Sequence, residues 1–185
     1  MSAPRLRPLD PPYAPETAAL VAEVMGPGRE PIGLFRTLAR VPRVLARLKG
    51  GSFLDKGPVP LRLRELAILR TTARLGCEYE WGVHVSIFAA KAGFGPAQVA
   101  ATVLGGAEDS AWTDARDRLV LRLCDALIDA HDIDDALWGE LAAAFDEATL
   151  VELIAVIGNY TGISGLVRAL RVAPEAFAPR FPKPT

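Results

Sequence analysis

The stretch that decides the fold covers residues 61–92 and reads LRLRELAILRTTARLGCEYEWGVHVSIFAAKA. Residues 61–75 combine strong helix formers with apolar side chains almost all round, which predicts a buried helix. Gly76 is the residue type that most often ends a helix, and a second helix is predicted over residues 77–92. Because one glycine separates the two helices, we expect an antiparallel hairpin at the centre of the fold.

The rest of the chain also predicts helices, and no segment shows the alternation typical of a strand. Ser110, Asp134 and Asp146 are the expected N-caps of the last three helices. Helices are expected over residues 16–25, 32–41, 43–49, 96–104, 111–130, 135–145 and 147–170, and the first is expected to end at Gly26-Pro27-Gly28. The prediction is an all-α fold of about eight or nine helices in a single domain over residues 1–185, without tandem repeats.

Both ends of the chain are rich in proline. Residues 1–15 are expected to form an extended arm that lies on the surface or on a neighbouring subunit, and residues 173–185 a proline-rich tail. Prolines limit how far either segment can pack by itself, so both favour contact with a second copy of the chain.

Composition excludes several classes of partner. A formal net charge of -1 over 185 residues gives no electrostatic basis for binding nucleic acid or an anionic membrane. Uninterrupted apolar stretches fall short of the roughly 18 residues that span a bilayer, and nothing near Met1 resembles a secretory leader. The two cysteines, Cys77 and Cys124, lie far apart in sequence and are expected to be free thiols in a cytoplasmic protein. We expect neither a metal nor a cofactor.

One face of the second hairpin helix carries the residues best suited to chemistry. Cys77, Glu80, Trp81, His84 and Phe88 project within an arc of roughly 100°. The helix N-terminus lowers the pKa of a thiol in the first turn, whereas the nearby carboxylate opposes this effect. His84 can exchange a proton near neutral pH, with Glu80 as its partner, while the two aromatic residues can form an apolar wall.

Glu65 lies on the first hairpin helix, and the reversal at Gly76 brings it toward the same face. Carboxylates buried beside an imidazole acquire shifted pKa values, which favours proton transfer. Each residue also has a purely structural explanation when taken alone. Glu65 suits a solvated helix start, Cys77 and the aromatic residues suit a core, Cys124 lies on an apolar stripe, and His131 suits a helix end.

Taken together, residues 64–70 (RELAILR) and 77–84 (CEYEWGVH) resemble the carboxymuconolactone decarboxylase family, including its alkyl hydroperoxidase D-like members. Residues 35–40 with Pro42 are similar to the family's upstream helix. The stretch from Asp132 through Asp134, Trp138 and Glu152 to Gly158 and Tyr160 is similar to its C-terminal half. The resemblance covers most of residues 30–172, and it implies an alkyl hydroperoxidase D-like multi-helix bundle that assembles into trimers or dimers.

The resemblance also implies a site. Hydroperoxidase members use a glutamate, a Cys-x-x-Cys pair and a histidine, and Glu65, Cys77 and His84 match three of these positions. Glu80 stands at the fourth, so the internal disulfide of a dithiol cycle cannot form, and Cys124 lies on another helix. The arrangement of Glu80, Trp81 and His84 is instead similar to the decarboxylase side of the family.

Three functions follow as hypotheses. The first is an enzyme in which Glu80 and His84 move protons, Glu65 sets their charge state, and the substrate is a small organic acid or lactone. The second is a one-cysteine peroxidase in which Cys77 is reduced by an external thiol. The third is a catalytically silent oligomeric binding protein. Arg70 and Arg74 are candidates to hold a substrate carboxylate, and Gly158, Gly162 and Gly165 would allow close helix approach between subunits.

Overall fold

The computed structural model describes residues 3–25 and 29–184, which form nine α-helices and one π-helix and contain no strand. The all-α prediction is therefore confirmed. The expected end of the first helix at Gly26-Pro27-Gly28 lies outside the described residues. The helices are α1 (Pro15–Met25), α2 (Gly33–Leu38), α3 (Pro42–Gly50), α4 (Leu61–Arg74), α5 (Glu78–His84), the π-helix η1 (Val85–Ala89), α6 (Pro96–Leu104), α7 (Ala115–Ala130), α8 (Asp135–Ala144) and α9 (Glu147–Leu170).

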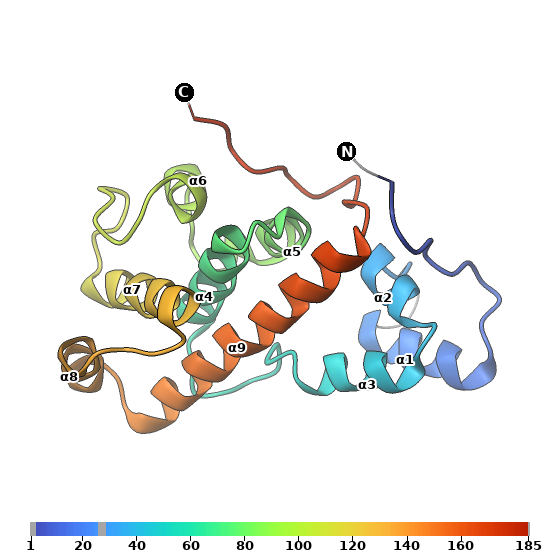
Figure 1. The fold of residues 1–185 in the computed structure, drawn as a ribbon, viewed down its shortest axis with the longest axis horizontal. Helices are drawn as coiled ribbons and strands as arrows, with labels where there is room; N and C mark the ends of the chain where they lie inside the picture. The colour runs from blue at the N-terminus through green and yellow to red at the C-terminus, as the bar shows by residue number, and fades with distance from the viewer. Residues whose placement is uncertain (1–2, 26–28, 185) are drawn as a thin grey trace.

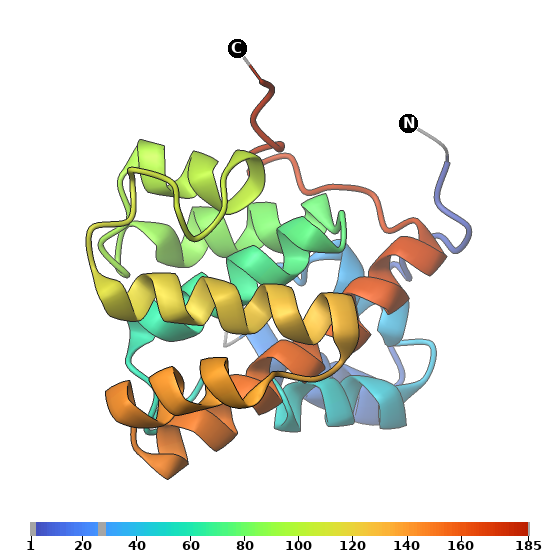
Figure 2. The same cartoon turned by 60° about the vertical axis from the view of Figure 1, so that its left-hand side comes forward.

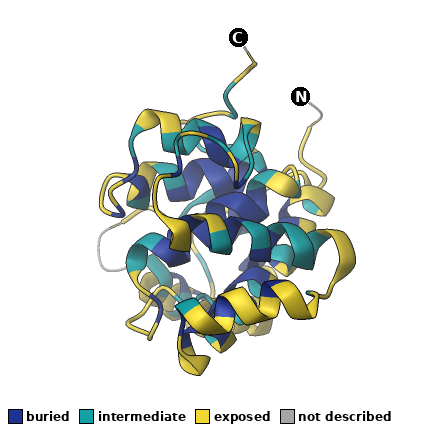
Figure 3. Ribbon diagram, turned by 90° about the vertical axis from the view of Figure 1, so that its left-hand side faces the viewer, coloured by how far each residue is buried: buried dark blue, intermediate teal, exposed yellow. Residues whose placement is uncertain are grey.

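Helix α4 is the centre of the molecule. Its residues from Leu63 to Thr72 are all buried, as its apolar composition predicts. It packs against α5 and α6, against α7, and against the long helix α9, which runs diagonally across the fold in Figure 1. Figure 2 shows α7 between α5 and α6 on one side and α8 and α9 on the other. Buried residues accordingly gather on the inner helices in Figure 3.

The predicted hairpin of α4 and α5 is confirmed. The chain reverses at Gly76, whose φ of +65° suits glycine, and the Cys77 amide donates to the Thr72 carbonyl at 2.8 Å. Farther from the turn, His84 lies beside Glu65. The pairing of residues 72 with 77 and 65 with 84 makes the two helices antiparallel.

The second half of the hairpin is not one continuous α-helix. Helix α5 ends at His84, and the next five residues form η1 before the chain leaves the helix at Gly93, whose φ is +75°. A π turn inserts one extra residue into the helical repeat, so side chains after His84 are rotated relative to the register expected from a regular helix. Hydrophobic periodicity over so short a stretch does not distinguish the two forms.

The N-caps of the last helices are partly as expected. Asp134 accepts from the Leu137 amide, and Asp146 accepts from the Thr149 amide, each at 2.7 Å. Ser110 is wrong as the cap of α7. The cap is Asp114, which accepts from the Arg116 amide at 2.8 Å. The preceding residues instead form a turn that buries Trp112 completely, and this burial keeps them out of the helix.

The two proline-rich ends both lie on their own chain. In the N-terminal arm, the Arg5 amide donates to the Leu170 carbonyl at 3.0 Å, so this segment lies on the surface, which was one of its two expected places. The expectation that the C-terminal tail cannot pack alone is wrong. Glu175 accepts from the hydroxyl of Tyr79 and from the amide of Gly33, each at 2.6 Å, which anchors the tail to α5 and α2.

Helix α9 is long and apolar enough to cross a membrane by length and composition, with a mean hydropathy of 1.6 over its window. The sequence expectation missed this because single polar residues interrupt its apolar runs. One such helix is weak evidence for a membrane span, because core helices pass the same test of length and composition, and 44% of this window is buried inside the fold.

Candidate functional site

The four residues predicted to be catalytic come together inside the fold. Glu65 projects from α4, while Cys77 precedes α5 as its N-cap and Glu80 and His84 belong to α5. All four are buried, and Glu65 is completely inaccessible to solvent. The hairpin turn at Gly76 makes this possible, since it folds α5 back along α4.

Glu65 and His84 form the shortest contact of the site. Glu65 Oε2 lies 2.7 Å from His84 Nδ1, so the imidazole Nδ1–H donates to the carboxylate. The other oxygen, Oε1, accepts from Arg64 Nε at 3.1 Å. With a donor on each oxygen, Glu65 is held in place and fixes the orientation of the imidazole, leaving Nε2 for chemistry.

Glu80 faces that second imidazole nitrogen. Its Oε2 lies 3.8 Å from His84 Nε2, and its Oε1 has no hydrogen-bond partner among the described residues. Burial raises the pKa of Glu80, an effect that the nearby His84 partly offsets. A carboxyl group with a raised pKa retains its proton at higher pH and can donate it to a substrate.

The raised pKa of Glu80 predicts a pH-dependent stability. The unfolded chain ionises this residue near its ordinary pKa of 4.5, whereas the folded protein resists ionisation, so stability is lost as pH rises from there through the folded pKa. Glu80→Gln removes the ionisation. We compare the free energy of unfolding of Glu80→Gln with that of the parent protein at each pH. The variant should gain stability relative to the parent as pH rises from 5 to 8.

Urea unfolding at the two pH values measures this difference, and Glu30→Gln, at an exposed position, is the control. If pH changed the relative free energy of unfolding equally in both variants, burial of the ionised Glu80 would not destabilise the folded state.

Cys77 is poorly activated as a nucleophile. Burial, followed by the charge of Glu80, raises the pKa of its thiol to about 11, although the Glu80 amide, the Ser164 hydroxyl and the charge of Arg168 act in the opposite direction. The thiol is therefore protonated at neutral pH. Cys124 is completely buried in the core, as expected, and both cysteines are free.

Aromatic rings flank the imidazole on two sides. Phe88 lies 5.3 Å from His84 between ring centroids, and Tyr160 of α9 lies 5.1 Å away in an edge-to-face arrangement. Phe88 thus has the position expected of an apolar wall. Trp81 does not join this group: its indole N–H donates to Thr102 Oγ1 at 2.9 Å, and its ring packs against Phe181 of the tail.

Sequence reasoning missed Arg64, Tyr160 and Ser164 as members of the site. Arg64 directly precedes Glu65 in the sequence, and this neighbouring position could have identified it. Tyr160 and Ser164 come from α9, and no local pattern connects them to α5. The Ser164 hydroxyl is buried and lies close enough to Cys77 to lower the pKa of its thiol.

The arginines expected to hold a substrate carboxylate face another way. Arg70 forms two hydrogen bonds with Asp125 of α7, at 2.7 and 2.8 Å, and Arg74 pairs with Asp125 and Asp129. Both arginines therefore form ion pairs that connect α4 to α7. Within residues 3–25 and 29–184, no group of three or more histidine, cysteine or acidic side chains is arranged to hold a metal ion.

The buried hairpin brings a Glu–His pair together with a second glutamate and a thiol, and this arrangement can be compared with known proteins. The sequence model of the carboxymuconolactone decarboxylase family matches residues 39–121. The resemblance drawn from the motif is therefore confirmed over these residues. No curated protein matches the chain in sequence.

Solved structures share the alkyl hydroperoxidase D-like fold over almost the whole chain. An uncharacterized peroxidase-related protein from Silicibacter sp. TM1040 is 16% identical, with a TM-score of 0.80 over 95% of this chain and 94% of that one. An alkylhydroperoxidase AhpD core protein from Ralstonia eutropha JMP134 is also 16% identical, with a TM-score of 0.76 over 95% of each chain. The debrominase Bmp8, solved with 2,3,4-tribromopyrrole, is 20% identical, with a TM-score of 0.73 over 92% of this chain and 91% of that one.

Proposed function

We propose that the protein is an acid/base enzyme of the carboxymuconolactone decarboxylase family that acts on a small organic acid or lactone. The observation that carries the proposal is the alignment of Glu65, His84 and Glu80, in which one carboxylate orients the imidazole and the other faces its free nitrogen. The match of residues 39–121 to the family model supports this chemistry at the level of the family only.

Each residue has a distinct role in this proposal. Glu65 holds His84 through the Nδ1–H, so Nε2 acts as the base that takes a proton from the substrate. Glu80, whose pKa is raised by burial, donates a proton to the group on which negative charge develops. Phe88 and Tyr160 limit the access of water to the imidazole.

The experiment that tests the proposal is a pair of assays on the purified protein. One measures release of carbon dioxide from muconolactone-type acids, and the other measures consumption of an organic hydroperoxide in the presence of a small thiol. We expect turnover in the first assay. Peroxide consumption without release of carbon dioxide would contradict the proposal.

A one-cysteine peroxidase is the second candidate, and the peroxidase-related solved structures with the same fold favour it. In that reaction the Cys77 thiolate attacks the peroxide, the O–O bond breaks, and a sulfenic acid and an alcohol form. An external thiol then reduces the sulfenic acid. The pKa of about 11 argues against this candidate, because little thiolate exists at neutral pH. Ligand binding without turnover in either assay would support a silent binding protein instead.

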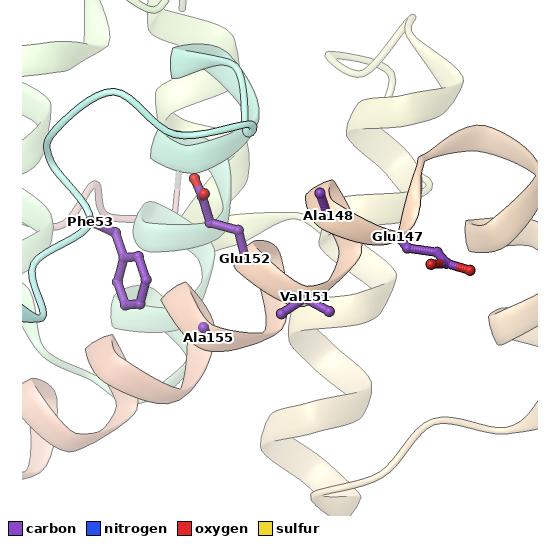
Figure 4. Close-up of a pocket in the computed structure, with 6 residues that line it drawn as sticks. All are labelled: Phe53, Glu147, Ala148, Val151, Glu152 and Ala155. Atoms are coloured by element: carbon purple, nitrogen blue, oxygen red, sulfur yellow. The ribbon is translucent and has the colours of Figure 1, made fainter.

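We also propose that the protein is a homo-oligomer in which the outward face of α9 contacts a second copy. A shallow groove lies beside this face, and Figure 4 shows residues that line it, among them Phe53 and, from α9, Val151 and Ala155. Val151 is 68% exposed. Farther along the same helix, small residues leave room for a close neighbour, and a net charge of -1 gives little repulsion between copies.

The oligomer proposal predicts a larger particle than one chain of 19.8 kDa in light scattering at micromolar concentration. Gly162→Arg should shift the protein toward the monomer, because a large charged side chain would fill the space needed by the second copy. The single chain should still fold, because a Cβ at this exposed position meets nothing within 4 Å. Gly139→Arg on α8 is the matched control, since it is equally open. A monomeric parent protein would refute the proposal.

A further inference from the structure

A pocket of about 500 Å³ opens beside the N-terminus of α5, and Cys77 is one of the residues that line it. Its walls come from segments far apart in sequence: the turn at Gly76, the end of α9, and the C-terminal tail. This volume is in the range of small-molecule sites. The pocket thus joins the surface to one of the four residues of the candidate site.

Basic side chains dominate the charge of this pocket. Arg168 and Arg171 at the end of α9 and Arg180 of the tail line it, and Glu78 is the acidic residue in its lining. Glu78 pairs with Arg180 at 2.7 Å. The side chains of Arg168 and Arg171 form no hydrogen bond or ion pair with any of the residues that the structure describes, so the pocket keeps an excess of positive charge.

Arg168 is directed toward the thiol end of the pocket. Its guanidinium carbon lies 3.7 Å from the place where a Cβ on Gly76 would stand, which sets the charge against the turn that precedes Cys77. This is an ordinary van der Waals distance, so the guanidinium lies directly against the turn. Its charge also acts on the thiol, where it favours the anionic form.

The remaining lining is apolar. Val167 and Val172 are buried, and Pro4 and Pro174 also line the pocket. A ligand that matches both parts has an anionic group for the guanidinium forks and a hydrocarbon body for the valines and prolines. An organic carboxylate has both groups, whereas an inorganic anion has the negative charge but no hydrocarbon body.

We propose that this pocket binds the carboxylate of a small organic acid through Arg168 and Arg171, with the body of the acid against Val167, Val172 and Cys77. The inference rests on the proposed function in taking this acid to be the substrate. It assigns the carboxylate recognition that Arg70 and Arg74 cannot supply, because both are paired with α7.

Isothermal calorimetry on the full chain tests the pocket without any need for turnover. The probes are adipate, its neutral diamide and inorganic phosphate. We expect adipate to bind, the diamide to give no detectable binding, and phosphate to bind at least about tenfold more weakly because it has no apolar body. Arg168→Gln and Arg171→Gln should each weaken adipate binding by about tenfold or more. Arg122→Gln, at an exposed arginine on α7 that pairs with Glu140, should leave it unchanged.

Equal binding of adipate to the parent protein and to both pocket variants would overturn the inference, and so would phosphate binding as tight as that of adipate. The test is independent of the proposed function. If the protein turns over an organic acid but Arg168→Gln does not change binding, the pocket assignment is wrong and the proposed function stands. If adipate binding depends on the arginines but the protein shows no turnover, the pocket assignment stands and the proposed function is wrong.

Discussion

Replacing His84 with glutamine should lower turnover of an organic-acid substrate by about two to four orders of magnitude, the usual contribution of a positioned acid/base group. Glutamine occupies a similar volume and can still donate to Glu65, but it cannot accept and release a proton. The measurement is the initial rate of carbon dioxide release at saturating substrate, with circular dichroism to verify that the variant is folded.

Cys77→Ser is the variant that separates the two enzymatic candidates. It should leave turnover within about tenfold of the parent protein, because acid/base chemistry at His84 does not use the thiol. The parent thiol should also alkylate slowly at pH 7 and faster as pH approaches 11, its pKa in the folded protein. Complete loss of activity in Cys77→Ser, together with rapid alkylation at neutral pH, would replace the acid/base proposal with the one-cysteine peroxidase.

The largest expected effect on stability is that of Arg62→Met, which should lower the free energy of unfolding by about 3 kcal/mol. Arg62 holds Asp117 with hydrogen bonds from two guanidinium nitrogens, and the Asp117 side chain is only 1% exposed. Methionine keeps much of the packing volume but leaves a buried carboxylate without its partner. Urea unfolding at neutral pH measures the change.

Arg122→Met is the matched control for this experiment. Arg122 also donates from two guanidinium nitrogens to one carboxylate, that of Glu140, but both side chains are exposed. Water can replace the lost partner there, so a much smaller change is expected. Similar losses in both variants would show that the number of hydrogen bonds, and not burial of the carboxylate, determines the contribution of such pairs.

The sequence predicted the centre of the fold because its signals there are local. Gly76 marks the reversal, and continuous apolar composition marks α4 as buried. The π turn after His84 and the cap at Asp114 were missed for a different reason. Both depend on tertiary packing, as the buried ring of Trp112 illustrates, and neither leaves a periodic pattern in the sequence.

The candidate site divides in the same way. Glu65, Cys77, Glu80 and His84 were found because they lie on two consecutive helices, where spacing predicts proximity. Tyr160 and Ser164 were not found, since their place beside α5 depends on how α9 crosses the hairpin. Trp81 shares the helix face by angle, yet its polar ring nitrogen finds an acceptor in Thr102, which draws the indole away from the imidazole.

Arg64 has one further consequence for the way the molecule works. The same guanidinium that donates to Glu65 also donates to the backbone carbonyl of Phe53, at 3.2 Å. Phe53 lines the groove beside α9, so a single side chain connects the face proposed to contact a second copy with Glu65, which holds His84. We therefore expect occupancy of the groove and occupancy of the site to affect one another, and such an effect is reciprocal: the factor by which one changes the affinity of the other is the same in both directions.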